Sequence, residues 1–258
     1  PVKMKELPPH VVQALMSIED RRFYSHFGVD VFGLFRAIWT NYRAGHVVQG
    51  GSTITQQLAK NFLQSQNLYG VNDKSLRRKV QEALLAVWLE YKFTKDQILT
   101  IYLNRVYLGS GTFGIEAAAQ HYFGKPAREL TLYESAVIAG LLKAPSRYSP
   151  ANNPQLADGR ATQVLNSMVE EGYITEDVKE AALTMTASPP EVHQGQNIRY
   201  FCDWIVDSIG DYVSVDGEDL VVSTTLDLSL QQKAEENLQK IMNENSKEAH
   251  AHQMAFIA

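Results

Sequence analysis

Two glutamates, Glu19 and Glu82, occupy positions where a carboxylate could take part in proton transfer. Glu19 follows Leu15 by four residues in a segment with helical spacing of apolar side chains, so it lies at the edge of an apolar helix face. A carboxylate half-buried against aromatic groups can be poised to exchange a proton. The alternative is a solvated helix end, and residues 17–28, SIEDRRFYSHFG, taken alone favour that commoner case.

Glu82 presents the same combination of charge and apolar surroundings. It shares one stripe of a helix expected over residues 75–92 with Arg78, Ala86 and Leu89. The alternative interpretation is an exposed salt bridge between Arg78 and Glu82, four residues apart, which contributes roughly a few tenths of a kcal/mol. For Glu82 taken alone, the spacing favours the salt bridge.

Glycines, hydroxyls, amides and one lysine are concentrated between the two glutamates, in residues 49–61, QGGSTITQQLAKN. Glycines permit close backbone approach, while hydroxyls and amides hydrogen-bond to oxygen-rich groups. The composition predicts a cradle for a polyol or a phosphate, and a generic flexible loop is the alternative.

Several common kinds of chemistry have no candidate residues in this sequence. GSGTFG, residues 109–114, matches GxGxxG, but it follows an expected helix without a βαβ unit, so we expect a helix-to-helix turn. The seven histidines are scattered and Cys202 is the one cysteine, so neither a metal cluster nor an internal disulfide is expected. GxSxG, SxxK and DxD motifs are absent, which leaves the carboxylates as candidates.

Charge is unevenly distributed along the 258 residues, which are otherwise ordinary for a soluble globular fold at 45% hydrophobic and 21% charged. The net charge of −5 combines +5 in the first 100 residues with −10 in the remainder. This favours an anionic ligand or membrane surface near the first part, and no nucleic-acid motif accompanies it. No apolar stretch reaches 18 residues, and we expect a fragment of a longer protein whose upstream membrane anchor is missing.

The elements that must position these residues are mainly helices. Their expected limits are a start at Pro8 and Pro9, a helix over 75–92, a helix capped by Thr94 and Gln97 that ends at Gly109, a helix capped by Thr131 and Glu134, and a helix over 155–171 before Gly172. A linker is expected at 188–197, SPPEVHQGQN. Beyond it a strand at 219–226, a helix at 229–244 and a strand at 253–258 predict the start of a second domain.

Together these stretches resemble the peptidoglycan glycosyltransferase domain of bifunctional class A penicillin-binding proteins, glycosyltransferase family 51. The five motifs of the family appear in order as EDRRFYSHFG (19–28), GGSTITQQLAKN (50–61), RKVQEALLA (78–86), KDQILTIYLNRVYLG (95–109) and, more loosely, GRATQVLNSM (159–168). Gly159 stands where the family usually has arginine. The resemblance covers about residues 5–185, and STTLDLSLQQKAEENL (223–238) is similar to the family's connector.

The resemblance implies a mainly α fold. A lysozyme-like glycosyltransferase domain with a membrane-apposed jaw subdomain would occupy residues 1–188, and residues 189–258 would be a short α+β fragment leading to the transpeptidase. The transpeptidase serine would lie beyond residue 258, so no reaction with β-lactams is expected.

The activity implied is polymerisation of lipid II into β-1,4 glycan strands, with inversion and release of undecaprenyl pyrophosphate. Glu19 would be the general base, Glu82 the second carboxylate, and Lys60, Arg78 and Lys79 would stabilise the pyrophosphate. The other substrate-binding residues implied are Asp20, Phe23, His26, Gly50, Thr53, Gln56, Gln57 and Asn61. No cofactor is required, and a divalent cation, Mg²⁺ or Mn²⁺, is an optional helper.

Residues 29–45 hold more apolar groups than one buried stripe can use. In the family such a segment dips into the bilayer beside the substrate, which implies that Phe32, Phe35 and Trp39 face the membrane. Filling the core is the alternative role for each of these side chains. The implied location is the outer, periplasmic or extracytoplasmic, face of the bacterial inner membrane. The implied partners are lipid II, the growing glycan strand, the membrane surface and proteins of a cell-wall synthesis complex, without nucleic acid.

Two other functions remain open. A lysozyme-like muramidase or lytic transglycosylase also combines a helical fold with an essential glutamate, but it has no pyrophosphate to bind, so the basic residues Lys60, Arg78 and Lys79 argue against it. A non-catalytic scaffold in a cell-wall complex would not need both Glu19 and Glu82.

Overall fold

The computed structural model describes residues 1–45, 50–66, 68, 73, 75–184, 198–209 and 222–249. The chain divides into two compact units, Pro1–Asp203 and Trp204–Ala258, and we describe each by itself. The mainly α class is confirmed, since helices dominate the described residues and no strand is assigned among them. The expected domain boundary at residue 188 lies outside the described residues.

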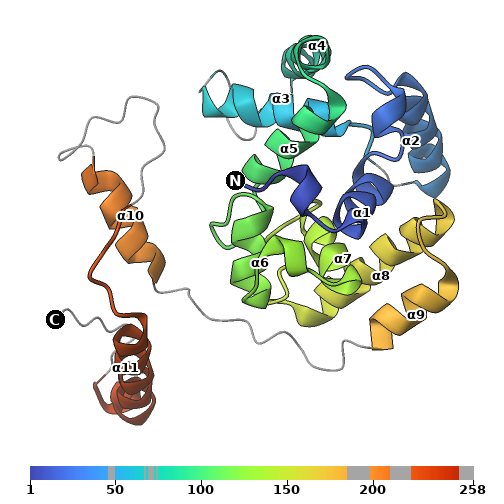
Figure 1. The fold of residues 1–258 in the computed structure, drawn as a ribbon. Helices are drawn as coiled ribbons and strands as arrows, with labels where there is room; N and C mark the ends of the chain where they lie inside the picture. The colour runs from blue at the N-terminus through green and yellow to red at the C-terminus, as the bar shows by residue number, and fades with distance from the viewer. Residues whose placement is uncertain are drawn as a thin grey trace. The chain divides into compact units, whose positions relative to one another are not determined.

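The first unit is an assembly of packed helices (Figure 1). Their bounds are α1 (Pro9–Glu19), α2 (Val31–Ala44), α3 (Ile54–Ser65), α4 (Leu76–Lys92), α5 (Lys95–Arg105), α6 (Ile115–Phe123), α7 (Leu132–Leu141), α8 (Pro154–Glu170) and α9 (Glu176–Thr184). Short 3-10 turns lie at Met4–Glu6, Phe23–Ser25 and Ala127–Glu129. α10 (Ile198–Ile209) contains the boundary between the units, and α11 (Leu228–Ala249) belongs to the second.

Most of the expected helix limits are confirmed by the capping contacts. Thr94 and Gln97 form a reciprocal capping box at the start of α5, in which each side chain bonds the backbone N–H of the other. The expected end of that helix is wrong, because α5 ends at Arg105 and Gly109 lies in the turn before α6 with a φ of +92°. A Cβ on Gly109 would come 2.8 Å from the Tyr122 hydroxyl, so the turn needs glycine for space as well as for φ.

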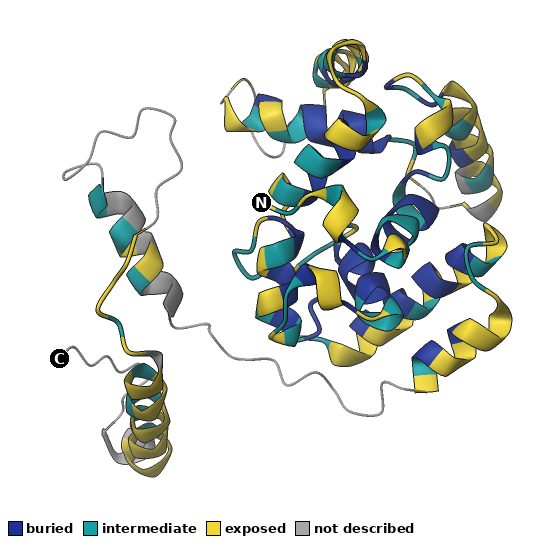
Figure 2. Cartoon of the chain, in the orientation of Figure 1, coloured by how far each residue is buried: buried dark blue, intermediate teal, exposed yellow. Residues whose placement is uncertain are grey.

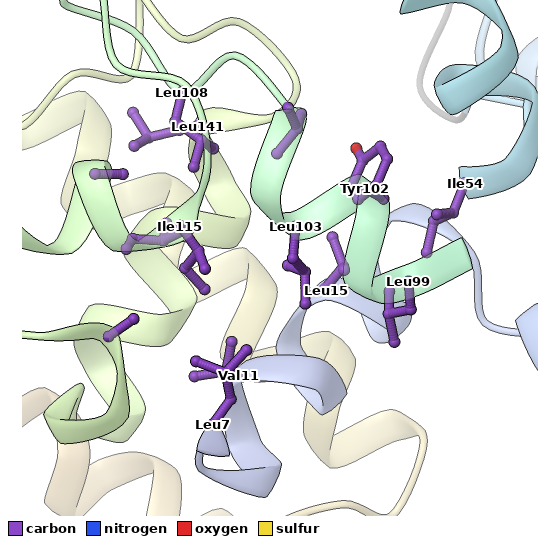
Figure 3. Packing of buried hydrophobic residues seen from close by; sticks show 14 of the residues in the cluster. Leu7, Val11, Leu15, Ile54, Leu99, Tyr102, Leu103, Leu108, Ile115 and Leu141 are labelled. Carbon is purple, nitrogen blue, oxygen red and sulfur yellow. The ribbon is translucent and has the colours of Figure 1, made fainter. Parts of the chain in front are cut away.

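The core fixes the ends of α1 and α5 in place. Leu15 of α1, Ile54 of α3 and Leu99 of α5 belong to one cluster of buried side chains, together with Tyr102 (Figure 3). A second buried cluster joins α1 to α7 and α8, and every residue of α7 from Ser135 to Leu141 is buried. Close packing of this kind leaves little freedom to the side chains at the helix ends.

α2 behaves differently, because its large apolar side chains face outward (Figure 2). Phe32 is 73% exposed, Phe35 is 68% exposed and Trp39 is 61% exposed, whereas Ala37 is the buried residue among the described side chains of α2. The core-filling alternative is therefore wrong for these three aromatic side chains.

In the second unit, α11 contains the helix expected over residues 229–244. The expected strand at 219–226 is described only from residue 222, and residues 222–227 are not assigned to a strand. A strand needs a neighbour to complete its backbone hydrogen bonds, and the second expected strand, 253–258, lies outside the described residues. No described helix of either unit combines the length and the apolarity needed to cross a membrane.

Candidate active site

Glu19 is the last residue of α1 and remains partly accessible to solvent. Its Oε2 accepts a 2.8 Å hydrogen bond from Nε2 of Gln57 on α3. Burial of the carboxyl raises the pKa of Glu19, against the Gln57 hydrogen bond and the positive charge of Arg160 and Lys143, which lower it. A reachable carboxyl with a raised pKa is suited to accept a proton from a substrate.

Gln57 also contacts α5. Its Oε1 accepts a 2.7 Å hydrogen bond from the hydroxyl of Tyr102 on α5. Tyr102 is completely buried, and burial raises its pKa well above the usual value, so the hydroxyl keeps its proton and acts as a donor (Figure 3). A continuous chain of hydrogen bonds therefore runs from α5 through α3 to Glu19.

Asp20, the residue after Glu19, attaches the first motif to the start of α3. Its Oδ2 accepts from the backbone N–H of Ile54 at 3.0 Å and lies 3.0 Å from Nε2 of His26. Phe23 is fully buried and meets the His26 ring edge-on, with centroids 6.1 Å apart. A carboxylate at a helix N-terminus is favoured by the helix dipole, so Asp20, Phe23 and His26 fix the segment that follows Glu19 to the start of α3.

The second motif divides into residues that build the start of α3 and residues that follow it. Thr53 and Gln56 are buried and form a capping box, and the Thr53 hydroxyl also donates to the carbonyl of Gly28 at 2.6 Å. Gln57, Lys60 and Asn61 are partly exposed, and their spacing places them on one side of α3. Gly50 precedes the helix and is exposed.

Glu82 is bound by two cations inside the protein. Its Oε1 lies 3.3 Å from Nε of Arg78 and its Oε2 lies 2.8 Å from Nζ of Lys79, while the Glu82 side chain is only 1% exposed. The predicted Arg78–Glu82 pair exists, but the interpretation of it as an exposed surface bridge is wrong. Lys79 also donates to the hydroxyl of Ser52 at 3.1 Å, and its side chain is 45% exposed.

The first three motifs meet at the start of α3. Gln57 connects that helix to Glu19, and Ser52, just before it, connects to Lys79 beside Glu82. Gly28, with a φ of +80°, lets the first motif press against α4, where a Cβ would come 2.8 Å from the backbone of Ala86. The fold thus assembles the predicted carboxylates and cations around one helix terminus.

Sequence reasoning did not select three residues near Glu19, namely Tyr102, Lys143 and Arg160. Arg160 is 8% exposed, donates to Gln163 at 3.0 Å and lies over the Tyr148 ring. Two of the three carried a signal, because Tyr102 and Arg160 interrupt apolar helical stripes with polar groups that need partners when buried. Lys143 is exposed, and no pattern in the sequence distinguishes it.

Arg21 connects the end of α1 to the end of α8. Its guanidinium reaches Glu170 at 2.8 Å and Glu171 at 3.0 Å, and its Nε donates to the backbone carbonyl of Ser17. These contacts lie near the surface and join two helix ends, so they give Arg21 a structural role.

The described part of the chain contains no group of three or more His, Cys, Asp or Glu side chains that could hold a metal ion. Glu82 already has two cations at its oxygens, and the Asp20 carboxylate is occupied by His26 and the start of α3.

The described helical unit therefore offers a reachable carboxyl, Glu19, and a second, buried carboxylate, Glu82, paired with two cations, as a candidate active site. The family model described as transglycosylase matches residues 1–169, more than half of the chain, and the chain belongs to this family.

Named relatives agree with this assignment. The chain is 44% identical over 245 residues to penicillin-binding protein 1A of Aquifex aeolicus (strain VF5), covering 93% of this chain and 32% of that protein. It is 49% identical over 176 residues to penicillin-binding protein 1A of Escherichia coli (strain K12), covering 68% and 20%. A crystal structure of penicillin-binding protein 1A from Haemophilus influenzae aligns at a TM-score of 0.45 and 22% identity, covering 84% of this chain and 22% of that one. The chain spans about a third or less of the curated relatives it matches.

Proposed function

We propose that this chain is a peptidoglycan glycosyltransferase that polymerises lipid II into β-1,4 glycan strands. The observation that carries the proposal is the Glu19 carboxyl, accessible at the end of α1, with its pKa raised by burial and one amide donor at 2.8 Å. Membership of the transglycosylase family supports the same reaction class.

The reaction is a single displacement at the anomeric carbon of the donor sugar. The 4-hydroxyl oxygen of the acceptor sugar forms the new bond, the bond to the undecaprenyl pyrophosphate breaks, and Glu19 takes the hydroxyl proton. Attack from the face opposite the leaving group inverts the α linkage to β. The raised pKa of Glu19 suits a base that must hold this proton until water removes it.

The leaving pyrophosphate is stabilised by cations on α3 and α4. Arg78 offers a planar guanidinium for two phosphate oxygens, and Lys79 and Lys60 add two ammonium groups. Glu82 holds Arg78 and Lys79 at 3.3 and 2.8 Å, which keeps both side chains in position before substrate arrives. Cations in this arrangement allow the pyrophosphate to leave without full protonation.

The proposed reaction needs no cofactor. The described carboxylates do not form a cage for a divalent cation, so we assign no step to Mg²⁺ or Mn²⁺. Either ion would reach the site bound to the phosphate oxygens of the substrate.

The proposed substrate is a membrane lipid, and two exposed apolar surfaces suit contact with a bilayer. One is formed on α2 by Phe32, Phe35 and Trp39. The other is a stripe on α4 whose members recur at helical spacing and are 40–85% exposed: Leu76, Val80, Leu84, Val87, Trp88 and Tyr91. We therefore place the enzyme at the outer face of the inner membrane, where the growing strand and other cell-wall synthesis proteins are its partners.

The test is to incubate the chain with labelled lipid II in detergent and to measure polymer. We expect polymer from the unmodified chain and a loss of about 10²–10⁴-fold in rate from Glu19→Gln, the usual contribution of a general base. Glu129→Gln is a matched control, because Glu129 is exposed on a 3-10 turn and pairs with Arg128. Equal polymer from Glu19→Gln and Glu129→Gln would remove Glu19 as the base.

The second candidate function is a muramidase or lytic transglycosylase. A glutamate with a raised pKa, as in Glu19, favours it as much as it favours the polymerase, whereas the cations around Glu82 do not. Cleavage of finished peptidoglycan without polymer formation from lipid II would select this second function, and inactivity in both assays with lipid II still bound would select a scaffold.

A further inference from the structure

The side-chain amide of Gln57 lies between two groups with opposite requirements. Its Nε2 donates to Glu19 at 2.8 Å and its Oε1 accepts from Tyr102 at 2.7 Å. An amide can rotate by half a turn and exchange its oxygen for its nitrogen, so one of these partners must determine which end faces Glu19.

Tyr102 is able to determine that orientation. Its ring is 0% exposed and packs in the main core cluster with Ile54 and Leu99, so the position of its hydroxyl is fixed by close packing. Burial raises the pKa of Tyr102 well above its ordinary range, so the hydroxyl presents a proton. If the Gln57 amide rotated, its NH₂ group would face the Tyr102 hydroxyl. The hydroxyl proton would then lose the amide oxygen that accepts it.

Rotation of Gln57 would also change the surroundings of Glu19. The carboxylate would face an amide oxygen instead of an N–H donor, and two acceptor oxygens at hydrogen-bond distance repel each other unless a proton lies between them. Glu19 would then hold a proton before the acceptor sugar arrives, and a protonated carboxyl cannot act as a base.

We propose that Tyr102 is a positioning residue for glycosyl transfer, which acts through Gln57 to keep an N–H donor directed at Glu19. The inference rests on the proposed role of Glu19 as general base. It gives Gln57 a role in orienting the carboxylate, beside the substrate contact that the family resemblance implies for it.

The test compares Tyr102→Phe with Tyr122→Phe in the 258-residue chain, with lipid II in detergent. Tyr122 is also completely buried, and its hydroxyl donates to the carbonyl of Leu108 at 2.9 Å. We expect Tyr102→Phe to move the acidic limb of the kcat profile upward by about one pH unit, with about tenfold lower kcat below the new midpoint. The KM for lipid II should stay within about twofold, and Tyr122→Phe should leave the limb in place.

A double-mutant cycle with Gln57→Ala shows whether Tyr102 acts through the amide. If it does, adding Tyr102→Phe to Gln57→Ala lowers kcat no further, whereas independent effects would multiply. Multiplying effects, or an unmoved acidic limb in Tyr102→Phe, would overturn the inference. If Tyr102→Phe fails to fold by circular dichroism, Gln57→Ala alone provides the second variant. It removes the N–H donor that lowers the pKa of Glu19, so the acidic limb should move upward, and an unmoved limb would overturn the inference.

Glu19→Gln, measured in parallel, distinguishes a failure of the proposed general base from a failure of the Tyr102 inference alone. Full polymer synthesis by Glu19→Gln removes the proposed base, and the Tyr102 inference fails with it. An inactive Glu19→Gln beside a Tyr102→Phe that matches Tyr122→Phe removes the Tyr102 inference alone.

Discussion

The end of α1 and the first half of α4 each carry a glutamate, partly accessible in Glu19 and buried in Glu82, and the two carboxylates have different partners. Glu19 receives one neutral amide donor from Gln57 and has its pKa raised by burial. Glu82 lies within 3.3 Å of both Arg78 and Lys79, so its charge is balanced inside the protein. A carboxylate without an adjacent ion pair can take up a proton, whereas a carboxylate bound by two cations is better suited to hold those cations in place.

The largest expected difference is kinetic. Glu19→Gln should lower kcat by about 10²–10⁴-fold with little change in KM, because it removes an interaction used in the transition state. Glu82→Gln should lower kcat by a smaller factor and raise the KM for lipid II, because Arg78 and Lys79 lose the carboxylate that holds them. Steady-state kinetics with labelled lipid II measures both constants. Equal losses of kcat would mean that the two carboxylates share one role.

The next largest expected difference between Glu82 and Glu19 is the effect of each substitution on the free energy of unfolding. Glu82→Gln leaves Arg78 and Lys79 without their counter-charge beside a side chain that is 1% exposed. Loss of one partner of a fully buried pair costs about 3–5 kcal/mol, and partial exposure of the two cations reduces the expectation to about 1–3 kcal/mol. Urea denaturation followed by circular dichroism measures this free energy of unfolding. An unchanged midpoint would show that the cations find other partners.

Glu19→Gln should change stability in the opposite direction and in a pH-dependent way. The folded-state pKa of Glu19 is raised above its ordinary value by burial, so the wild type loses stability as the pH rises from the ordinary glutamate pKa through the raised one. The variant has no such loss of stability, so its Tm should rise above that of the wild type across this pH window and stay above it at neutral pH. Thermal scans from pH 4 to pH 8 measure the gap, and a gap that closes as the pH rises would contradict the burial argument.

The smallest expected effect is the loss of stability when the ion pairs of Arg21 are removed. Arg21 pairs with glutamates near the surface, whereas Arg78 pairs with the buried Glu82. The Glu170 side chain is 62% exposed, so water and salt screen its contact with Arg21. Arg21→Ala should therefore cost about 1 kcal/mol or less, and less still in high salt, with kcat unchanged. Urea denaturation in low and high salt, run beside Glu82→Gln, measures the difference. A cost equal to that of Glu82→Gln would show that exposure does not separate the two kinds of ion pair.

Particular residues show how much could be predicted from the sequence. The helix starts at Pro9, Thr94 and Thr131 follow from local chemistry, because proline geometry and capping boxes involve residues only three or four positions apart. The end of α5 was predicted at Gly109 but falls at Arg105. Gly109 lies in the turn beyond the helix, where its positive φ and the nearby Tyr122 hydroxyl leave no room for a Cβ.

In the site too, features set by neighbouring residues could be predicted, and contacts between distant residues could not. Glu19, Glu82, Arg78 and Lys79 could be selected because charges within apolar helical stripes are visible in the sequence. Their environments could not be predicted from it, and the spacing around Glu82 alone favoured an exposed salt bridge. Burial depends on which helix covers a position, and for Glu82 that cover includes α3, separated from it along the chain.

The sequence by itself determined a mainly helical chain, the order of its motifs and the identity of two unusual carboxylates. These properties depend on spacing and residue type, which the chain carries whether or not it is folded. The tertiary structure alone decided that Gln57 meets Glu19, that Tyr102 meets Gln57 and that the Glu82 carboxylate is buried between two more exposed cations. Hydrogen bonds between residues 38 and 45 positions apart, and the desolvation that raises the pKa of Glu19, exist only after the helices have packed.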